Sequence, residues 1–156
     1  MVRIFILIFI IIPNILLSQS QVLNGINLNG PEGFVKVDDL TWMKGNDLIG
    51  VFAVKETKDD MWSSEFWEKT CRNGTRTTEF HSLKDYELNG DNYSICYQIG
   101  ENKMVIGQVL VWRGEYTYAI NVGVSMLNYK EPNQFSKSLK EVEFNIGYMI
   151  NRVLMF

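Results

Sequence analysis

The sequence predicts an α+β fold in which one antiparallel β-sheet of about six to seven strands is flanked by two helices. Segments with period-two alternation are separated by turns rich in Asn and Gly, and one helical segment interrupts them. An apolar stripe with three- and four-residue spacing then closes the chain. A length of 156 residues, with 46% hydrophobic and 21% charged residues, fits one domain with its own core.

Residues 1–20 have the pattern of a signal peptide. A short N-terminal segment carries one positive charge, Arg3. An apolar run follows, which is broken only by Pro13-Asn14 and ends at Ser18-Gln19-Ser20. The run is shorter than the ~20 apolar residues that a membrane span needs. We therefore expect cleavage before Gln21 or Gln19, and an exported protein (periplasmic or extracellular) with no stable membrane span. The alternative is an uncleaved N-terminal anchor.

Residues 21–33 predict a leader loop, and residues 34–156 a single α+β domain. Short strands are expected at 34–37 and 40–43, followed by a strand at 48–54 that is apolar on both faces and therefore central in the sheet. The period then changes. A helix is expected over Asp60–Arg72, with an Asp at its N-cap and Asn73-Gly74 as its stop signal.

The second half predicts an antiparallel meander of strands at 77–88, 93–99, 104–112 and 116–124, in which Asn89-Gly90 is the strongest turn signal. A helix over Pro132–Val153 follows, with Pro132 at its first position. Its apolar stripe comprises Phe135, Leu139, Val142, Ile146, Met149, Ile150 and Val153. The residues off this stripe are Lys137, Lys140, Glu141 and Asn145. The stripe should lie across the sheet and bury Tyr116, Tyr118, Ile120 and Val122.

The two cysteines, Cys71 and Cys96, both lie after the signal peptide. Because oxidising compartments favour disulfides, an exported chain with two cysteines predicts a bridge between them. The alternative is two independent buried thiols. Ile95 and Tyr97 should face one side of the sheet and Cys96 the other, so a bridge would place the two helices on opposite faces.

This order of elements, with Gly33-Phe34 entering the first strand, resembles the PsbP-like family, which has an α/β/α sandwich fold. The family includes extrinsic photosystem subunits, a nuclear Ran-releasing factor and small exported or chaperone-like bacterial proteins. The resemblance covers nearly the whole mature chain but rests on element order. It implies the sandwich and a protein that binds other proteins, and it carries over no functional residue.

No motif in the sequence indicates a specific chemistry. His81 is the only histidine, and the chain has neither a nucleophile elbow nor a phosphate-binding glycine loop. Acidic residues at Asp38-Asp39, Asp59-Asp60 and Asp91 are candidate calcium ligands, but acids at bends and helix starts have ordinary structural roles. We expect no metal and no cofactor. A net charge of −3 without a Lys/Arg run argues against a nucleic-acid partner.

Two of the four tryptophans are candidates for a partner-facing surface. Trp42 lies beside a turn and Trp62 in the first turn of the expected helix, whereas Trp67 and Trp112 fall at core positions. The sequence favours a small exported, non-catalytic protein that binds another macromolecule, in an accessory or chaperone-like role. The alternative is a small exported hydrolase or ligand-binding enzyme that uses carboxylates not identifiable from the sequence. Converging acids in a polar pocket would favour the enzyme, and an exposed aromatic patch the binding protein.

Overall fold

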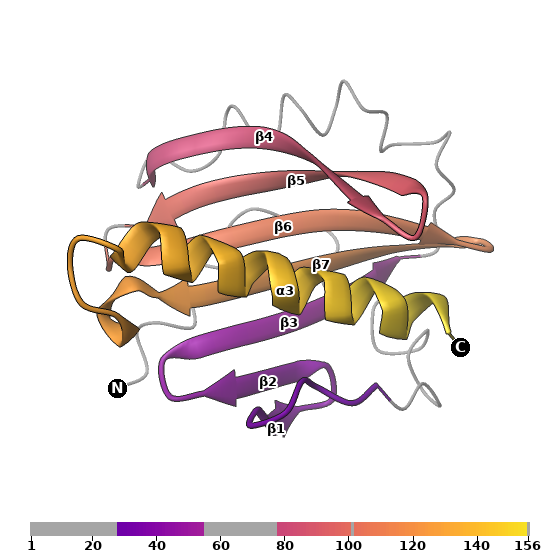
Figure 1. Ribbon diagram of the computed structural model, residues 1–156. Helices are drawn as coiled ribbons and strands as arrows, with labels where there is room; N and C mark the ends of the chain where they lie inside the picture. The colour runs from indigo at the N-terminus through magenta and orange to yellow at the C-terminus, as the bar shows by residue number, and fades with distance from the viewer. Residues whose placement is uncertain (1–27, 55–77, 101, 156) are drawn as a thin grey trace.

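One seven-stranded antiparallel sheet, with a long helix packed across one face, forms the part of the protein that the computed structural model describes, residues 28–54, 78–100 and 102–155 (Figure 1). Its strands are β1 (Val35–Asp38), β2 (Thr41–Lys44), β3 (Asp47–Val54), β4 (Thr78–Leu88), β5 (Asp91–Gly100), β6 (Met104–Arg113) and β7 (Tyr116–Ser125). A 3-10 turn, η2 (Met126–Asn128), precedes the helix α3 (Gln134–Leu154). The α+β class predicted from the sequence is therefore confirmed.

The sheet joins two meanders edge to edge, in the order β1-β2-β3-β7-β6-β5-β4. Strand β4 forms the other edge of the sheet, and β5, β6 and β7 follow it inward, so that β7 lies beside β3. Ile49 of β3 pairs there with Val122 of β7, and Val51 with Ile120. Strand β3 is thus interior, as the apolar sequence of residues 48–54 predicts. The expected meander is confirmed as well.

The turn between β4 and β5 has the conformation that its sequence demands. Asn89 and Gly90 both have positive φ, 55° and 86°, and Leu88 pairs with Asp91 across them. A two-residue hairpin turn of this kind matches the right-handed twist of the strands, and Asn-Gly is its preferred sequence. This pair therefore sets the register of β4 against β5.

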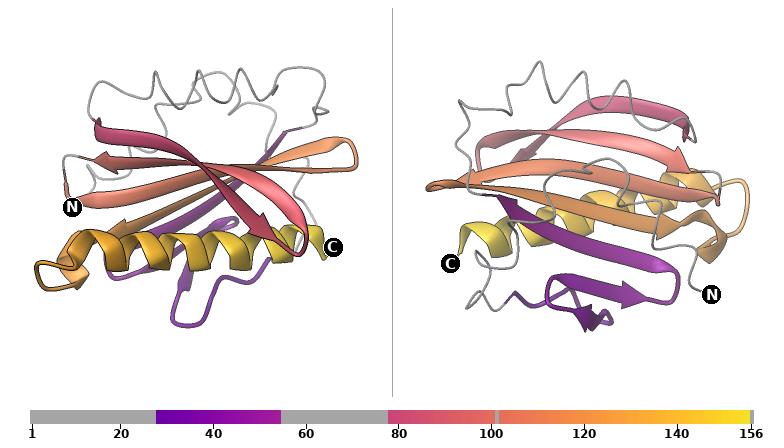
Figure 2. Two further views of the ribbon diagram at one scale, coloured as in Figure 1. Left: turned by 45° about the horizontal axis from the view of Figure 1, so that its top comes forward. Right: turned by 180° about the vertical axis from the view of Figure 1, so that it is seen from behind.

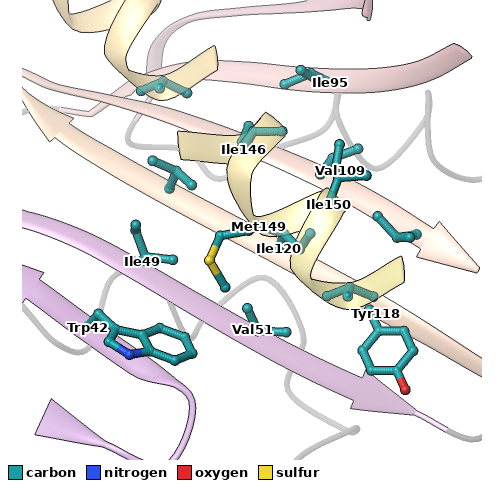
Figure 3. Close-up of a cluster of buried hydrophobic side chains, with 14 of the residues drawn as sticks. Trp42, Ile49, Val51, Ile95, Val109, Tyr118, Ile120, Ile146, Met149 and Ile150 are labelled. Carbon is teal, nitrogen blue, oxygen red and sulfur yellow. The ribbon is translucent and has the colours of Figure 1, made fainter. Parts of the chain in front are cut away.

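Helix α3 lies across β6 and β7 and closes one face of the sheet (Figure 2). Figure 3 shows Ile146, Met149 and Ile150 of the helix among the side chains of the sheet. The fully buried residues of this interface include Val142, Ile146, Met149, Ile150, Val153, Ile120 and Val122. Each such side chain contributes roughly 1.5–3 kcal/mol when buried. The predicted packing is confirmed with two exceptions. Tyr116, at the first position of β7, is only half-buried, and Phe135, the first residue of the predicted stripe, is 37% exposed.

Helix α3 packs closely against the sheet at Gly107 in β6. A Cβ atom there would lie 2.4 Å from Val142 Cγ1 and 2.7 Å from Ile146 Cδ1. Any side chain at this position would therefore push the helix away from the sheet.

Two details of the predicted helix are wrong. Pro132 lies in the turn before the helix, because the backbone N–H of Lys137 bonds to the carbonyl of Asn133 (3.0 Å) and makes Asn133 the N-cap. Asn145 is buried, with 2% of its surface exposed. It follows Val142 by three residues and precedes Met149 by four, which places it on the flank of the buried stripe.

The second predicted helix, Asp60–Arg72, lies outside the described residues, so the helix on the other face and the α/β/α sandwich stay predictions. Signal-peptide residues 1–20 also lie outside them. Residues 28–33, the described part of the expected leader loop, form neither helix nor strand. Leu28 nevertheless belongs to the core beneath α3, since only 2% of it is exposed. The folded unit therefore includes at least residue 28, ahead of the predicted boundary at 34.

Candidate functional site

The prediction that Trp42 faces a partner is wrong. Its side chain is 2% exposed and belongs to the main core (Figure 3), where Gly30 packs against the indole closely enough that a Cβ would lie 2.6 Å from Trp42 Cδ1. Trp42 pairs with Ile49 of β3, and this register turns its side chain to the α3 face. Trp62 and Trp67 lie outside the described residues. Trp112 is half-buried against Leu110.

Cys96 lies on the sheet face opposite α3. It is fully buried and packs with Leu110, whereas its neighbours Ile95 and Tyr97 point into the core beneath the helix. The predicted alternation along β5 is thus confirmed. Cys71 lies outside the described residues, and the bridge between the two stays a prediction.

Three amide side chains form a buried ladder on the same face. Gln98 Nε2 donates to Gln108 Oε1 (3.4 Å), and Gln108 Nε2 donates to Asn121 Oδ1 (2.6 Å). The ladder crosses β5, β6 and β7, and at most 7% of each side chain is exposed. Buried amides stabilise a structure only when they are paired, so the ladder favours one strand register over its alternatives. Amides are not nucleophiles, and the ladder has a structural role.

A second buried polar group, Asp47, links the start of β3 to the end of β7. Its Oδ1 accepts from the Ser125 backbone N–H (2.9 Å), and Asn128 Nδ2 donates to both carboxylate oxygens (2.8 and 2.9 Å). Burial raises the pKa of Asp47 above its usual value, although these hydrogen bonds act in the opposite direction. The sequence shows only an Asp at a turn and gives no sign of this anchor.

The acidic residue nearest to Asp47 on the helix is Glu141, which is also engaged. Tyr129 Oη donates to Glu141 Oε2, and Lys44 Nζ lies 3.9 Å from Glu141 Oε1. Burial and this hydrogen bond raise the pKa of Tyr129 to about 12. Asp47 therefore joins β3 to the end of β7 and to η2, and Glu141 joins the helix to Tyr129 and Lys44.

The described residues offer no cluster that could hold a metal ion. Among them, no three His, Cys, Asp or Glu side chains gather closely enough to hold a metal ion. Asp38 accepts from the backbone N–H of Asp39 (2.7 Å), which is an ordinary bend contact, and Asp91 is exposed. Asp59-Asp60 lies outside the described residues. No helix in the described ranges is long and apolar enough to cross a membrane.

The outward face of α3 exposes large apolar side chains. Phe144, in the middle of the helix, is 69% exposed, and Met155, its C-cap, is 76% exposed. The two are separated by about three helical turns and so lie almost on one line along the helix. Half-buried Tyr148 and Asn151 stand between them on the same side. We call Phe144, Tyr148, Arg152 and Met155 the outward stripe.

Two residues of this stripe, Tyr148 and Arg152, are held by hydrogen bonds. Tyr148 Oη donates to the carbonyl of Gly30 (3.3 Å) and accepts from Arg152 Nε and Nη2 (3.1 and 3.0 Å). The guanidinium also lies over the Tyr148 ring, 5.1 Å from its centroid. Tyr148 and Arg152 are therefore fixed in place on the surface, beside the exposed ring of Phe144.

Helix α3 carries acids and cations along its length. Glu143 accepts from Tyr97 Oη of the sheet (3.1 Å), and Glu141 has the partners given above. The cations Lys137, Lys140 and Arg152 are all exposed. In the part of the chain that the structure describes, none of these three forms an ion pair; Lys137 lies over the ring of Tyr129 instead.

Other exposed apolar residues lie at the edge of the sheet and in η2. Val35 and Val37 of β1 are 67% and 50% exposed, and Leu127 is 62% exposed. Strand β1 has four residues, an irregular register beyond Lys36 and a lysine within it. Short, irregular and charged edges resist pairing with a further strand. This edge is therefore a weaker binding surface than the outward stripe.

Sequence reasoning missed the outward stripe, although a signal for it exists. Counting apolar residues at helical spacing selects the face that packs on the sheet and leaves Phe144 unassigned. An aromatic residue midway along the polar face of an amphipathic helix is the feature that singles out this surface.

No protein-family model matches this sequence, and no curated protein matches it. The functional proposal therefore rests on the residues of this chain alone.

Proposed function

We propose that this is a small exported protein that binds another protein through the outward stripe of α3, in an accessory or chaperone-like role and without catalysis. One observation carries the proposal: Phe144 is 69% exposed in the middle of a helix whose opposite face is fully committed to the core. Aromatic residues, Met and Arg are enriched at protein interfaces, and a few of them carry most of the binding free energy. The stripe consists of these residue types.

The fixed geometry of Tyr148 and Arg152 supports the same proposal. Because their hydrogen bonds already restrict both side chains, binding would cost little additional side-chain entropy. The resemblance to PsbP-like proteins, which mostly bind other proteins, supports it from the order of elements. By contrast, the carboxylates of Asp47 and Glu141 make structural contacts, so they do not favour the hydrolase alternative.

Export rests on residues 1–20 and has its own test. Protein purified from the envelope or medium of the native host should begin at Gln19 or Gln21. An intact mass that retains Met1 would contradict cleavage.

Binding is tested by site-specific photocrosslinking in the native host. A photoreactive phenylalanine analogue replaces Phe144, and the matched control carries it at Asn102, an exposed turn residue between β5 and β6. We expect position 144 to form a discrete adduct with one protein, absent from position 102. Excess wild-type protein should compete with the adduct, and excess Phe144→Asp should not. No adduct at 144, or the same adducts from both positions, would overturn the proposal.

A further inference from the structure

We propose that two copies of this chain associate edge to edge through β4, so that their sheets join in an antiparallel register centred on Leu83. This inference goes beyond the proposed function, because it assigns a second surface and a different partner, another copy of the same chain. It follows from the length of the edge strand, the backbone groups that it presents and the order of its residues.

Strand β4 forms one edge of the sheet (Figure 1), and among the described elements only β5 pairs with it. It has 11 residues, whereas β1 at the opposite edge has 4. An edge strand presents a row of backbone N–H and C=O groups that can pair with another strand. The length of β4 therefore gives room for several hydrogen-bonded pairs, which β1 does not.

The β4–β5 hairpin determines which residues of β4 present these groups. Leu88 and Asp91 flank the two-residue turn, so they form a hydrogen-bonded pair. Hydrogen-bonded and non-hydrogen-bonded pairs alternate along an antiparallel ladder. From Phe80 onward, where the register is regular, the even-numbered residues therefore direct their N–H and C=O groups to β5. The odd-numbered residues direct theirs to the outer edge: His81, Leu83, Asp85 and Glu87.

A two-fold axis at Leu83 pairs these outward residues with one another. Leu83 then stands opposite Leu83 of the second copy, and on each side of this pair His81 stands opposite Asp85. Each of the three pairs can exchange two backbone hydrogen bonds. An imidazole N–H is a donor for a carboxylate in either protonation state. An aliphatic pair between two His–Asp pairs is therefore a favourable set of cross-strand neighbours.

The other face of the strand is compatible with the same register. Phe80 stands opposite Tyr86 of the second copy, and Ser82 opposite Lys84, on the sheet face that carries α3. Aromatic pairs across neighbouring strands stabilise a sheet. From Phe80 to Tyr86, therefore, no two like charges stand opposite each other.

The neighbouring registers are disfavoured by charge. A shift of two residues in one direction sets Lys84 opposite Lys84 of the second copy, and the same shift in the other direction sets Asp85 opposite Glu79. In the proposed register Glu79 would meet Glu87 if the pairing continued that far. The register of β4 is irregular at Glu79, so the regular edge ends before this contact. Because a two-fold interface uses the same patch twice, one self-complementary strand is sufficient for it.

Sedimentation equilibrium of the mature protein, purified from the exporting host, tests the proposal over a concentration series. We expect a monomer–dimer equilibrium. His81→Asp opposes two carboxylates at both flanking pairs, and Asp85→Lys removes the acceptor from both, so each variant should dimerise about tenfold or more weakly. A mixture of the two variants should recover the dimer, because one pair becomes Asp–Lys and the other stays His–Asp. The matched control, Asp91→Lys, makes the same charge change on an exposed residue beyond the paired segment and should dimerise like the wild type.

A second variant tests the backbone. Leu83→Pro removes an outward N–H and leaves the hydrogen bonds to β5 in place, so the monomer should keep its fold while the dimer is lost. A protein that stays monomeric throughout the series, a dimer that none of these variants weakens, or a mixture that stays monomeric would overturn the proposal. A dimer that Phe144→Ala abolishes would overturn it too, in favour of contact through the outward stripe. The crosslinking experiment is independent: an adduct at position 144 without a dimer leaves the binding function standing while this inference falls.

Discussion

Replacing Gly107 with alanine should destabilise the packing of helix α3 on the sheet. The added Cβ would lie 2.4 Å from Val142 Cγ1 and 2.7 Å from Ile146 Cδ1, well inside van der Waals contact. Both partners are fully buried, so neighbouring core side chains or the helix itself must shift to admit the new atom. Overpacking of this kind costs about 1–3 kcal/mol. A domain of this size has a total stability of roughly 5–15 kcal/mol, so the loss is large enough to measure.

Urea denaturation followed by tryptophan fluorescence measures this change as a lower midpoint at unchanged slope. The matched control is Gly50→Ala in β3, where the nearest side-chain atom, Phe52 Cε2, lies 3.4 Å from the new Cβ. The free energy of unfolding of this control should lie within about 0.5 kcal/mol of the wild-type value or slightly above it, because alanine restricts the unfolded chain more than glycine does. Val142→Ala removes the clashing methyl group, so the double variant should lose less stability than the two single losses together. Additive losses, or Gly107→Ala as stable as Gly50→Ala, would refute the close approach of α3 to β6.

Three further predictions concern the core, the anchor at Asp47 and the cysteines. Ile146→Asp should unfold the domain, because an unpaired charge at a fully buried site costs several kcal/mol; a variant that melts within a couple of degrees of the wild type would contradict the packing. Asp47→Ala should cost about 1–3 kcal/mol by leaving the Ser125 N–H without its acceptor, whereas Asp47→Asn retains an oxygen there and should cost less. Because burial raises the pKa of Asp47, its ionisation opposes folding; the stability of the wild type relative to Asp47→Asn should therefore rise as the pH falls from 7 toward 4, and a fall would refute the raised pKa. Denatured, non-reduced protein from the exporting host should contain no titratable thiol if Cys71 and Cys96 are bridged, and two free thiols would rule the bridge out.

Local patterns account for most of the described fold. The alternation in β5, β6 and β7, the Asn89-Gly90 turn and the apolar stripe of α3 each depend on residues close together in sequence, so one chain is enough to predict them. The pairing of β3 with β7 is different. It joins residues about seventy positions apart, and no short-range pattern specifies which strand lies beside another.

The wrong prediction that Trp42 is exposed has the same cause, which is that the sequence does not show how distant strands pair. Strand β2 has four residues, too few for an alternation that shows which side chains face the core. The register with β3, which sets Trp42 beside Ile49, determines its face. A nearby turn signal suggested exposure, whereas non-local pairing and the close packing of Gly30 bury the indole. Strand-end aromatics are therefore poor guides to a binding surface in a single sequence.

Fold and binding use opposite sides of α3, and this arrangement makes the binding proposal testable by mutation. Val142, Ile146 and the contact of Glu143 with Tyr97 hold the helix on the sheet, whereas Phe144 contributes little to burial because 69% of it is exposed. Exposed substitutions away from caps and buried contacts usually change stability by less than about 0.5 kcal/mol, and alanine has the higher helix propensity. Phe144→Ala should therefore unfold like the wild type. A loss of binding in a variant of unchanged stability would assign Phe144 to recognition, because misfolding would no longer explain the loss.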